Sequence, residues 1–331
     1  MRRLFDLLVF ALVERRVRRR FRKLIERTSN REPPGERRPL RVAVPRTANE
    51  KFLWRKIFDH DPRFTTVCDK LSCKEWVAAL GLGVDMAPVR WVGVDAALIP
   101  RRLLARDVVV KASHGCGTNL FPRRDAMSRD KVVRKANTFL ETPHGAREHE
   151  WGYFDVERRL FVEDVVGVGG APLTELKFYT FGGRVPRVVH IADRFGDMAA
   201  AKWEPGPGGA PLRAEGAASV SERVLDAPLP ACYPRALAVA KAIGAHFDHM
   251  RVDFLTDGDR FWLGELTAYN LGGKFRDCGH REEAPLSRAW DIGGTWFLAT
   301  AHEDPLMRLY ADALRRRLGS EPAARAYPAS L

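Results

Sequence analysis

The sequence predicts an α+β fold, because hairpins of β-strands are interspersed with amphipathic helices along a chain of 331 residues. The hydrophobic share of 45% is sufficient for a core, and the charged share of 29% is typical of a globular surface. This composition excludes a disordered chain, a collagen-like fibre and a membrane bundle. At roughly 150 residues per domain, the length corresponds to about two domains.

Most of the excess positive charge lies at the N-terminus. The chain has 55 Lys and Arg and 42 Asp and Glu, and residues 1–38 contain 13 and 5 of these, a net charge of +8. The rest of the chain contains 42 bases and 37 acids, a net charge of +5. This asymmetry indicates a basic arm that binds polyanions, attached to an ordinary enzyme-like body.

The arm begins with an apolar run over residues 4–13 that Asp6 interrupts. A bilayer span takes about 20 residues, and no small-residue cleavage site precedes the arginine cluster, so neither a span nor a signal peptide is expected. The arm then places four apolar side chains on one helical stripe among arginines. They are Val17, Phe21, Leu24 and Ile25.

A basic amphipathic helix within residues 1–30 is suited to an anionic membrane surface, where each base adds about 1 kcal/mol. A solvated helix, or one docked on a partner, is the alternative. Nucleic acid is disfavoured as a partner, because no aromatic platform accompanies the arginines. Pro33, Pro34 and Gly35 then predict a linker.

The cysteines predict a reducing compartment. Their number is odd and no two have CxxC spacing, which favours neither a disulfide framework nor a zinc knuckle. The five are Cys68, Cys73, Cys116, Cys232 and Cys278. We therefore expect a cytoplasmic protein, peripheral at the inner face of the cell membrane if the arm binds lipid.

Apolar residues at helical spacing predict four helices in the body. Asp69 is placed to cap the second helix and Gly81 to end it, and Pro234 lies at the start of the fourth. The predicted helices span residues 48–58, 69–81, 128–140 and 234–247.

Runs of β-branched and aromatic residues predict strands, four of which form two hairpins around Gly182-Gly183 and around residues 257–259. The predicted strands span residues 107–111, 160–166, 173–181, 184–192, 250–256 and 261–267, with a short strand within 84–94. Residues 196–230 are rich in Gly, Pro and Ala and predict a mobile loop.

The second hairpin carries two carboxylates. If Thr256 lies opposite Trp262, Asp253 lies opposite Glu265, and both side chains point to one face of the sheet. Facing carboxylates repel each other, and a hard cation such as Mg²⁺ removes that penalty. Asn270 can add a neutral oxygen. A pair of solvated carboxylates is the alternative.

The strand over 107–111 enters a small-residue loop, ASHGCGTN. Its glycines let the backbone approach an anion, to which Ser113 and Thr118 can donate, and Lys111 can place its ammonium beside a phosphate. The loop matches neither of the common glycine-rich nucleotide motifs, and a plain tight turn is the alternative. His114 and Cys116 have no second ligand pair, so a zinc site is not expected.

Further charged residues stand among apolar ones. Lys177 on a buried strand requires an anionic partner, and Glu163 can accept from a ribose or an amine. Arg194 and Arg251 can each donate two parallel hydrogen bonds to phosphate or carboxylate. Surface salt bridges are the alternative for each.

In their order along the chain, these segments resemble the ATP-grasp superfamily and, more narrowly, the TupA-like ATP-grasp proteins, a family associated with bacterial cell-surface polymers. The resemblance covers about residues 48–300. It is carried by Asp69-Lys70, VVVKASHGCGTN, FVEDVV, LKFYTFGG, ADRF, MRVDF and LGELT.

The resemblance implies a role for each matching residue. Lys111 and Lys177 match the lysines near the phosphates and adenine, Glu163 matches the acid beside adenine and ribose, and Asp253 and Glu265 match the Mg²⁺ ligands. The catalytic set is Arg251, Lys111 and Arg194, and Asn270 joins the metal ligands. The loop that covers the phosphates corresponds to Ser113, His114, Gly115, Gly117, Thr118 and Asn119.

Two departures from the family pattern bear on the substrate. Ala268-Tyr269-Asn270 replaces a proline that usually follows GELT, and Cys116 replaces a small hydroxyl residue.

The implied architecture is two α+β subdomains that clasp a nucleotide, with a small N-terminal helical and α/β region. The expected divisions are the arm and linker (1–38), the N-terminal region (39–105), the subdomain with the glycine-rich loop (106–160), the subdomain with the metal site (161–300) and a C-terminal helical tail (301–331).

The implied activity is that of an ATP- and Mg²⁺-dependent ligase that joins a carboxylate to an amine through an acyl-phosphate. The acceptor acid and the amine are expected to belong to a cell-surface polysaccharide or peptide precursor. An ATP-binding or phosphoryl-transferring accessory protein of a glycan assembly complex is the alternative.

Overall fold

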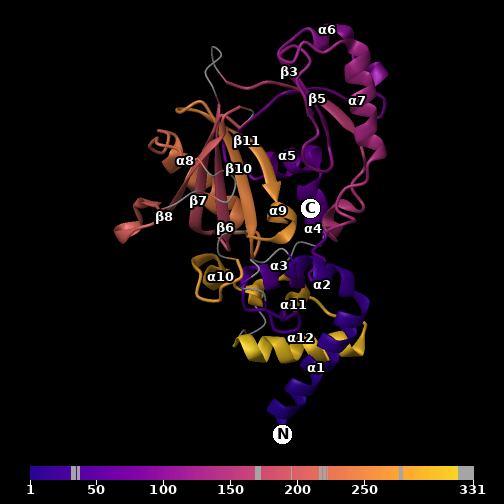
Figure 1. The fold of residues 1–331 in the computed structure, drawn as a ribbon, viewed down its shortest axis with the longest axis vertical. Helices are drawn as coiled ribbons and strands as arrows, with labels where there is room; N and C mark the ends of the chain where they lie inside the picture. The colour runs from indigo at the N-terminus through magenta and orange to yellow at the C-terminus, as the bar shows by residue number, and fades with distance from the viewer. Residues whose placement is uncertain are drawn as a thin grey trace.

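The computed structural model describes residues 1–30, 35, 38–167, 173–194, 196–215, 218, 221, 223–275 and 279–319. Within these residues, the chain forms a seven-stranded sheet of order β1-β11-β10-β6-β7-β8-β9 and a four-stranded sheet of order β2-β5-β3-β4. Figure 1 shows the large sheet at the centre, the small sheet with α7 to its upper right, and a helical base below. The fold is α+β, as the sequence predicts.

The large sheet is antiparallel except where β1 pairs in parallel with β11. Its strands are β1 (Asp85–Met86), β6 (Thr174–Phe181), β7 (Arg184–Ala192), β8 (Ala199–Pro205), β9 (Pro211–Ala214), β10 (Met250–Thr256) and β11 (Phe261–Thr267). The strands of the small sheet are β2 (Val89–Gly93), β3 (Val108–Ala112), β4 (Asn119–Leu120) and β5 (Leu160–Asp164).

Helices cover both sheets. On one face of the large sheet, α8 (Tyr233–Gly244), α4 (Arg63–Cys68) and α5 (Lys70–Ala79) share a core with the apolar side chains of β6, β10 and β11. The small sheet packs against α7 (Arg129–Glu141), α6 (Arg101–Leu104) and η2 (Ala96–Leu98). The other face of β6 and β7 contributes Tyr179 and Val189 to the core of the base.

The base consists of helices from both ends of the chain. It contains α1 (Arg2–Arg20), α2 (Arg22–Ser29), α3 (Ala48–Ile57), α10 (Pro285–Ala289), η5 (Ile292–Gly294), α11 (Trp296–Ala299) and α12 (Pro305–Leu318). Two short elements near the sheets are the turn α9 (Asn270–Gly273) and η3 (Trp151–Tyr153), and η4 (Pro207–Gly209) precedes β9.

Side-chain caps explain where the predicted helices begin. Asp69 accepts a hydrogen bond from the N–H of Leu71 and caps α5, as predicted. Ser128 caps α7 through the N–H of Lys131. At α3, Thr47 and Glu50 form a reciprocal capping box. These caps satisfy N–H groups that the first helical turn leaves without acceptors.

The arm does not present its predicted apolar stripe to a membrane. Val17, Leu24 and Ile25 are buried in the core of the base, and Phe21 packs against it. The carboxylate of Glu14 accepts hydrogen bonds from the N–H groups of Val42 and Ala43 at 3.1 and 2.7 Å. This stripe packs against the body because burial there removes its apolar surface from water.

Several predicted boundaries of domains and loops do not agree with the way the strands pair. The stretch 39–105 forms no body of its own, because β1 joins the large sheet and β2 the small one. The predicted division at 160 separates Leu160 from the rest of β5, which belongs to the small sheet. Residues 196–230 are not a single loop, because they contain β8 and β9. Pro33 and Pro34 of the predicted linker, and the end of the tail from 320 onward, lie outside the described residues.

Candidate active site

The two carboxylates of the second hairpin lie opposite each other. Asp253 on β10 pairs with Glu265 on β11, as predicted. The premise of that prediction was wrong by one residue, because Thr256 pairs with Phe261 rather than Trp262. A bulge that leaves Gly264 without a partner restores the register. On the other side of β10, Asp253 lies opposite Lys177 of β6.

The guanidinium of Arg251 joins the carboxylates and Asn270. It donates to both oxygens of Asp253 at 2.7 Å each, to Glu265 at 3.0 Å and to the side-chain oxygen of Asn270. The hydroxyl of Thr267 accepts another of its hydrogen bonds at 3.0 Å. The structure therefore brings together all three predicted metal ligands around one predicted catalytic residue.

Burial and pairing act in opposite directions on these groups. Burial raises the pKa of Asp253, but the charges of Arg251 and Lys177 outweigh it and leave the pKa below its ordinary value. Burial also lowers the pKa of Arg251, whereas Asp253 raises it by more, so the net pKa is higher than usual. Asp253 is therefore ionised and Arg251 protonated near neutral pH.

A second row of ion pairs continues along β6. Lys177 is buried and donates to Asp253 at 2.5 Å, and its ammonium also lies 3.0 Å from the carboxylate of Glu175. Arg194, which lies beyond the end of β7, contacts Glu175 at 3.1 Å. The predicted residues Lys177 and Arg194 are thus connected through Glu175, for which no role was predicted.

The small sheet contributes a second set of paired charges to the site. Lys111 of β3 and Glu163 of β5 lie diagonally on one face, because Val109 pairs with Glu163 and Lys111 with Phe161. Their side chains form an ion pair, and the ammonium of Lys74 lies 3.1 Å from Glu163. Burial raises the pKa of Glu163, but Lys111 and Lys74 lower it by more, so it is below its ordinary value.

Helix α5 connects the two sets. Its Lys70 donates to the backbone oxygen of Gly115 in the glycine-rich loop. Burial lowers the pKa of Lys70, an effect that nearby Glu265 opposes and nearby Lys111 reinforces. Lys70 therefore stands between the carboxylate of the large sheet and the lysine of the small sheet.

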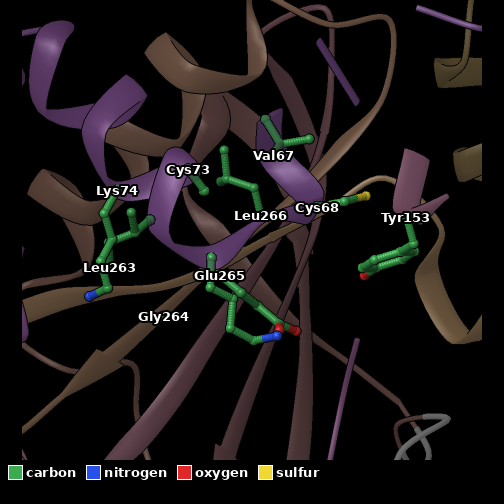
Figure 2. A pocket seen from close by; sticks show the side chains of 10 residues that line it. Val67, Cys68, Cys73, Lys74, Tyr153, Leu263, Gly264, Glu265 and Leu266 are labelled. Carbon is green, nitrogen blue, oxygen red and sulfur yellow. The ribbon is translucent and has the colours of Figure 1, made fainter. Parts of the chain in front are cut away.

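No role was predicted from the sequence for Lys70 or Lys74. A signal was present, because the two lysines are four residues apart and share one helical face directly after the Asp69 cap. Figure 2 shows the small hollow, of about 10 Å³, in which Lys74, Tyr153 and Glu265 are among the lining residues. A volume of this size holds about one water, so a larger ligand requires the ion pairs to separate.

The glycine-rich loop is held by its glycines and by buried side chains. Gly115 and Gly117 have φ angles of 75° and 72°, which glycine adopts without strain. Ser113 is buried and donates to the backbone oxygen of Glu157 at 2.8 Å. His114 is also buried, with Nε2 3.3 Å from the backbone oxygen of Thr142. These two side chains contact the protein backbone instead of forming part of the ion-pair network.

The remaining loop residues lie nearer the surface. The hydroxyl of Thr118 accepts from the N–H of Ala112 at 3.3 Å, and Asn119 is exposed at the start of β4. Binding of phosphate by the loop stays a prediction, and its backbone N–H groups fit that role better than the Ser113 and His114 side chains.

The donor set suits a hard cation. Asp253 and Glu265 supply carboxylate oxygens and Asn270 an amide oxygen, the ligand types that Mg²⁺ favours. In the part of the chain that the structure describes, no cluster of three or more His, Cys, Asp and Glu side chains is arranged to hold a metal. The site therefore offers two carboxylates and one amide, and Arg251 donates hydrogen bonds to all three side chains.

A family model for TupA-like ATP-grasp proteins matches residues 50–283. The chain belongs to this family, which lies within the ATP-grasp superfamily. A search of curated proteins finds no match.

The chain is also similar to solved ATP-grasp enzymes, at low identity. The ligase PsnB with its minimal precursor is 13% identical, with a TM-score of 0.37 and coverage of 73% of this chain and 66% of that one. The D-alanine–D-alanine ligase from Bacillus anthracis with ATP is 14% identical, with a TM-score of 0.37 and coverage of 77% and 68%. The D-cycloserine synthetase DcsG is 20% identical, with a TM-score of 0.31 and coverage of 76% and 70%. The chain thus spans about two thirds of the length of these structures.

Proposed function

We propose that the protein is an ATP- and Mg²⁺-dependent ligase that joins a carboxylate to an amine. The observation that carries the proposal is the presence of a set of ion pairs on each sheet, with Lys70 of α5 close to Glu265 of one set and Lys111 of the other. Together, the two sets combine lysines and arginines suited to a triphosphate with carboxylates suited to a divalent cation. Family membership supports the same activity, because the site residues lie within the matched segment.

The ion pairs explain how the ligand-free site stays stable. Without a nucleotide, each of the two predicted nucleotide-binding lysines is paired with a carboxylate of the site. Lys177 pairs with the proposed metal ligand Asp253, and Lys111 pairs with Glu163, the acid expected beside adenine and ribose. A buried charge without a partner is costly. Binding of the metal with the triphosphate exchanges these partners, since phosphate takes the lysines and the metal takes Asp253 and Glu265.

In the proposed reaction, a carboxylate oxygen of the acceptor bonds to the γ-phosphorus of ATP, and the bond from that phosphorus to ADP breaks. The amine then bonds to the acyl carbon, phosphate leaves, and the amine loses a proton to solvent or a nearby base. Lys111, Lys177 and Arg251 stabilise the charge that gathers on the transferred phosphoryl group. When bound, Mg²⁺ held by Asp253, Glu265 and Asn270 supplies further positive charge.

We propose that the acid and the amine belong to a cell-surface polysaccharide or peptide precursor, as the family implies. An ATP-binding or phosphoryl-transferring accessory role in a glycan assembly complex is the second candidate. It is favoured by the hydrogen bonds that Arg251 donates to Asp253, Glu265 and Asn270, which occupy oxygens of all three proposed metal ligands.

A paired-substrate screen tests the proposal. Purified protein with Mg²⁺ and ATP is incubated with sugar acids and amino acids, singly and in pairs, and release of ADP and phosphate is measured. A ligase releases phosphate only when an acid and an amine are both present. The variant Asp253→Asn serves as the inactive control. Nucleotide binding without turnover in any pair, with correctly folded protein, supports the accessory role instead.

We further propose that the first three turns of α1 hold the protein at an anionic membrane surface. Although the predicted stripe is buried, the opposite side of α1 exposes large apolar side chains, beside the basic residues Arg2, Arg3 and Arg15. The exposed residues are Leu4, Phe5, Leu7, Leu8 and Leu12. In Figure 1 this end of α1 projects from the base. Apolar surface beside arginines is suited to the boundary of an anionic bilayer. Within the described residues, no helix has the length and hydrophobicity to span a bilayer.

A further inference from the structure

A basic hollow lies between the arm and a turn of the body. Its volume is about 420 Å³, and its walls are the kink between α1 and α2 and the turn at residues 145–150. Six cations line it, with no carboxylate among the lining residues. They are Arg19, Arg20, Arg22, Lys23, Arg27 and Arg147. A concave surface lined by one sign of charge concentrates oppositely charged ligands.

The cations are only weakly neutralised by neighbouring acids. Among the described residues, Arg19, Arg20 and Lys23 have no ion-pair partner. The nitrogen of Arg22 lies 3.3 Å from Glu26, in a pair of which both members are more than half exposed. The nitrogen of Arg147 lies 3.9 Å from its neighbour Glu148. An ion pair as exposed as Arg22–Glu26 provides little stabilisation, about 0–1 kcal/mol.

The walls of the hollow are held in place. Arg27 donates to the backbone oxygen of Arg147, which links α2 to the turn. The ring of Phe21 at the kink packs edge-on against His149, with centroids 5.2 Å apart. Gly145 has a φ of 83°, and a Cβ there would lie 2.7 Å from the backbone oxygen of Glu150, so the turn requires glycine. The cations are therefore brought together by fixed backbone contacts.

We propose that this hollow is a binding site for a phosphate ligand with at least two negative charges, such as a diphosphate ester. Its size lies within the range of about 300–1,000 Å³ that is usual for small-molecule sites. Arginine donates paired hydrogen bonds that match phosphate oxygens. The same turn continues to Tyr153, which lines the hollow of Figure 2. The site is separate from the proposed nucleotide site and does not depend on the proposed ligase activity.

The test compares three forms of the full-length chain with the same probe, inorganic pyrophosphate, by titration calorimetry without divalent cations. The pocket variant carries Arg20→Gln, Lys23→Gln and Arg147→Gln. The matched control loses the same charge from the exposed side of α7 through Lys131→Gln, Arg134→Gln and Lys135→Gln. Pyrophosphate that binds among the lysines of the nucleotide site contributes equally to all three proteins.

We expect wild type and control to bind pyrophosphate equally and the pocket variant to bind at least about tenfold more weakly. A second arm uses phosphatidylcholine vesicles with and without phosphatidic acid. If vesicle binding requires phosphatidic acid and the pocket variant no longer shows this requirement, the ligand is a lipid headgroup. If the pocket variant loses pyrophosphate binding but binds vesicles like the control, the ligand is a soluble phosphate compound. Equal behaviour of the pocket variant and the control in both arms overturns the proposal.

The ring signals of His149 in proton NMR provide a local readout. Burial lowers the pKa of His149, and the positive charges of His60, Lys56 and Arg20 lower it further. A bound anion opposes these charges, so pyrophosphate raises the pKa of His149 in wild type and control. If this pKa does not respond in wild type, pyrophosphate does not occupy the hollow.

Discussion

Replacement of Lys177 by methionine tests the ion-pair network most sharply in the ligand-free protein. Removal of one member of a buried ion pair costs about 3–5 kcal/mol, because the other member is left without a partner. In this variant Asp253 and Glu175, the two carboxylates that contact Lys177, each still have an arginine partner. Arg251 lies 2.7 Å from Asp253, and Arg194 lies 3.1 Å from Glu175. The expected loss in the free energy of unfolding is therefore at the lower end, about 3 kcal/mol at pH 7.

The loss in the free energy of unfolding depends on pH, and the pKa of Asp253 determines whether it grows or shrinks as the pH falls. Although burial raises its pKa, Arg251 and Lys177 hold the pKa in the folded state below the ordinary value of 3.8. The resulting stabilisation is complete above the unfolded pKa of about 3.9, and disappears as the pH falls through the lower folded value. Lys177→Met lacks one of the two cations that stabilise ionised Asp253, so its stability falls less than that of wild type when Asp253 is protonated. The difference between the proteins is thus largest near pH 7 and shrinks below about pH 4.

Urea unfolding followed by tryptophan fluorescence measures both effects, from pH 7 downward in steps. The control Lys135→Met removes an exposed lysine of α7 and is expected to change stability by less than about 0.5 kcal/mol. A loss below about 1 kcal/mol for Lys177→Met, or a loss that does not change as the pH falls, refutes the network as described.

Two further predictions concern the arm and α5. The double variant Leu8→Gln and Leu12→Gln leaves urea stability within about 0.5 kcal/mol, because both side chains are exposed, but weakens sedimentation with anionic vesicles. Val94→Gln with Leu98→Gln is its control, and equal vesicle binding by the two proteins contradicts the membrane proposal. Asp69→Ala removes the cap of α5 and its contact with Arg159 at 2.9 Å, and costs about 1–2 kcal/mol. Asp69→Ala also weakens nucleotide binding, because α5 carries Lys70 and Lys74. The control Thr47→Ala removes the cap of α3 at a similar cost in stability and leaves nucleotide binding unchanged. Unchanged nucleotide affinity in Asp69→Ala would rule out this role of α5.

The strongest local patterns were sufficient to predict much of the fold. The hairpin of β10 and β11 has the predicted bounds, because alternating apolar residues flank a clear turn. Helix α7 lies one residue from its prediction, with Ser128 as its cap. Strand β8 was missed because Ala199, Ala200 and Ala201 have no β-strand signature of their own. Their strand depends on pairing with β7 and on burial of Ala200 against the base.

In the site, too, features that follow from local sequence patterns were predicted, and features that depend on tertiary packing were missed. The pairing of Asp253 with Glu265 was predicted from strand parity, although the bulge at Gly264 that produces it was not. The contribution of Lys70 and Lys74 was missed, because α5 faces the site only through its docking between the sheets. The stripe of the arm was interpreted as suited to a membrane surface, with a solvated or docked helix as the alternative, because the pattern of an amphipathic helix does not identify the surface that covers it.

The effect of Mg²⁺ on ADP affinity tests the central proposal most directly, namely that Asp253 and Glu265 together hold the metal. Titration calorimetry with and without Mg²⁺ compares wild type with Glu265→Gln, a change expected to preserve the fold because the Glu265 side chain is 35% exposed. We predict that Mg²⁺ strengthens ADP binding by wild type at least about tenfold and has little effect on the variant. An undiminished effect of Mg²⁺ in Glu265→Gln would contradict the assignment of this carboxylate pair.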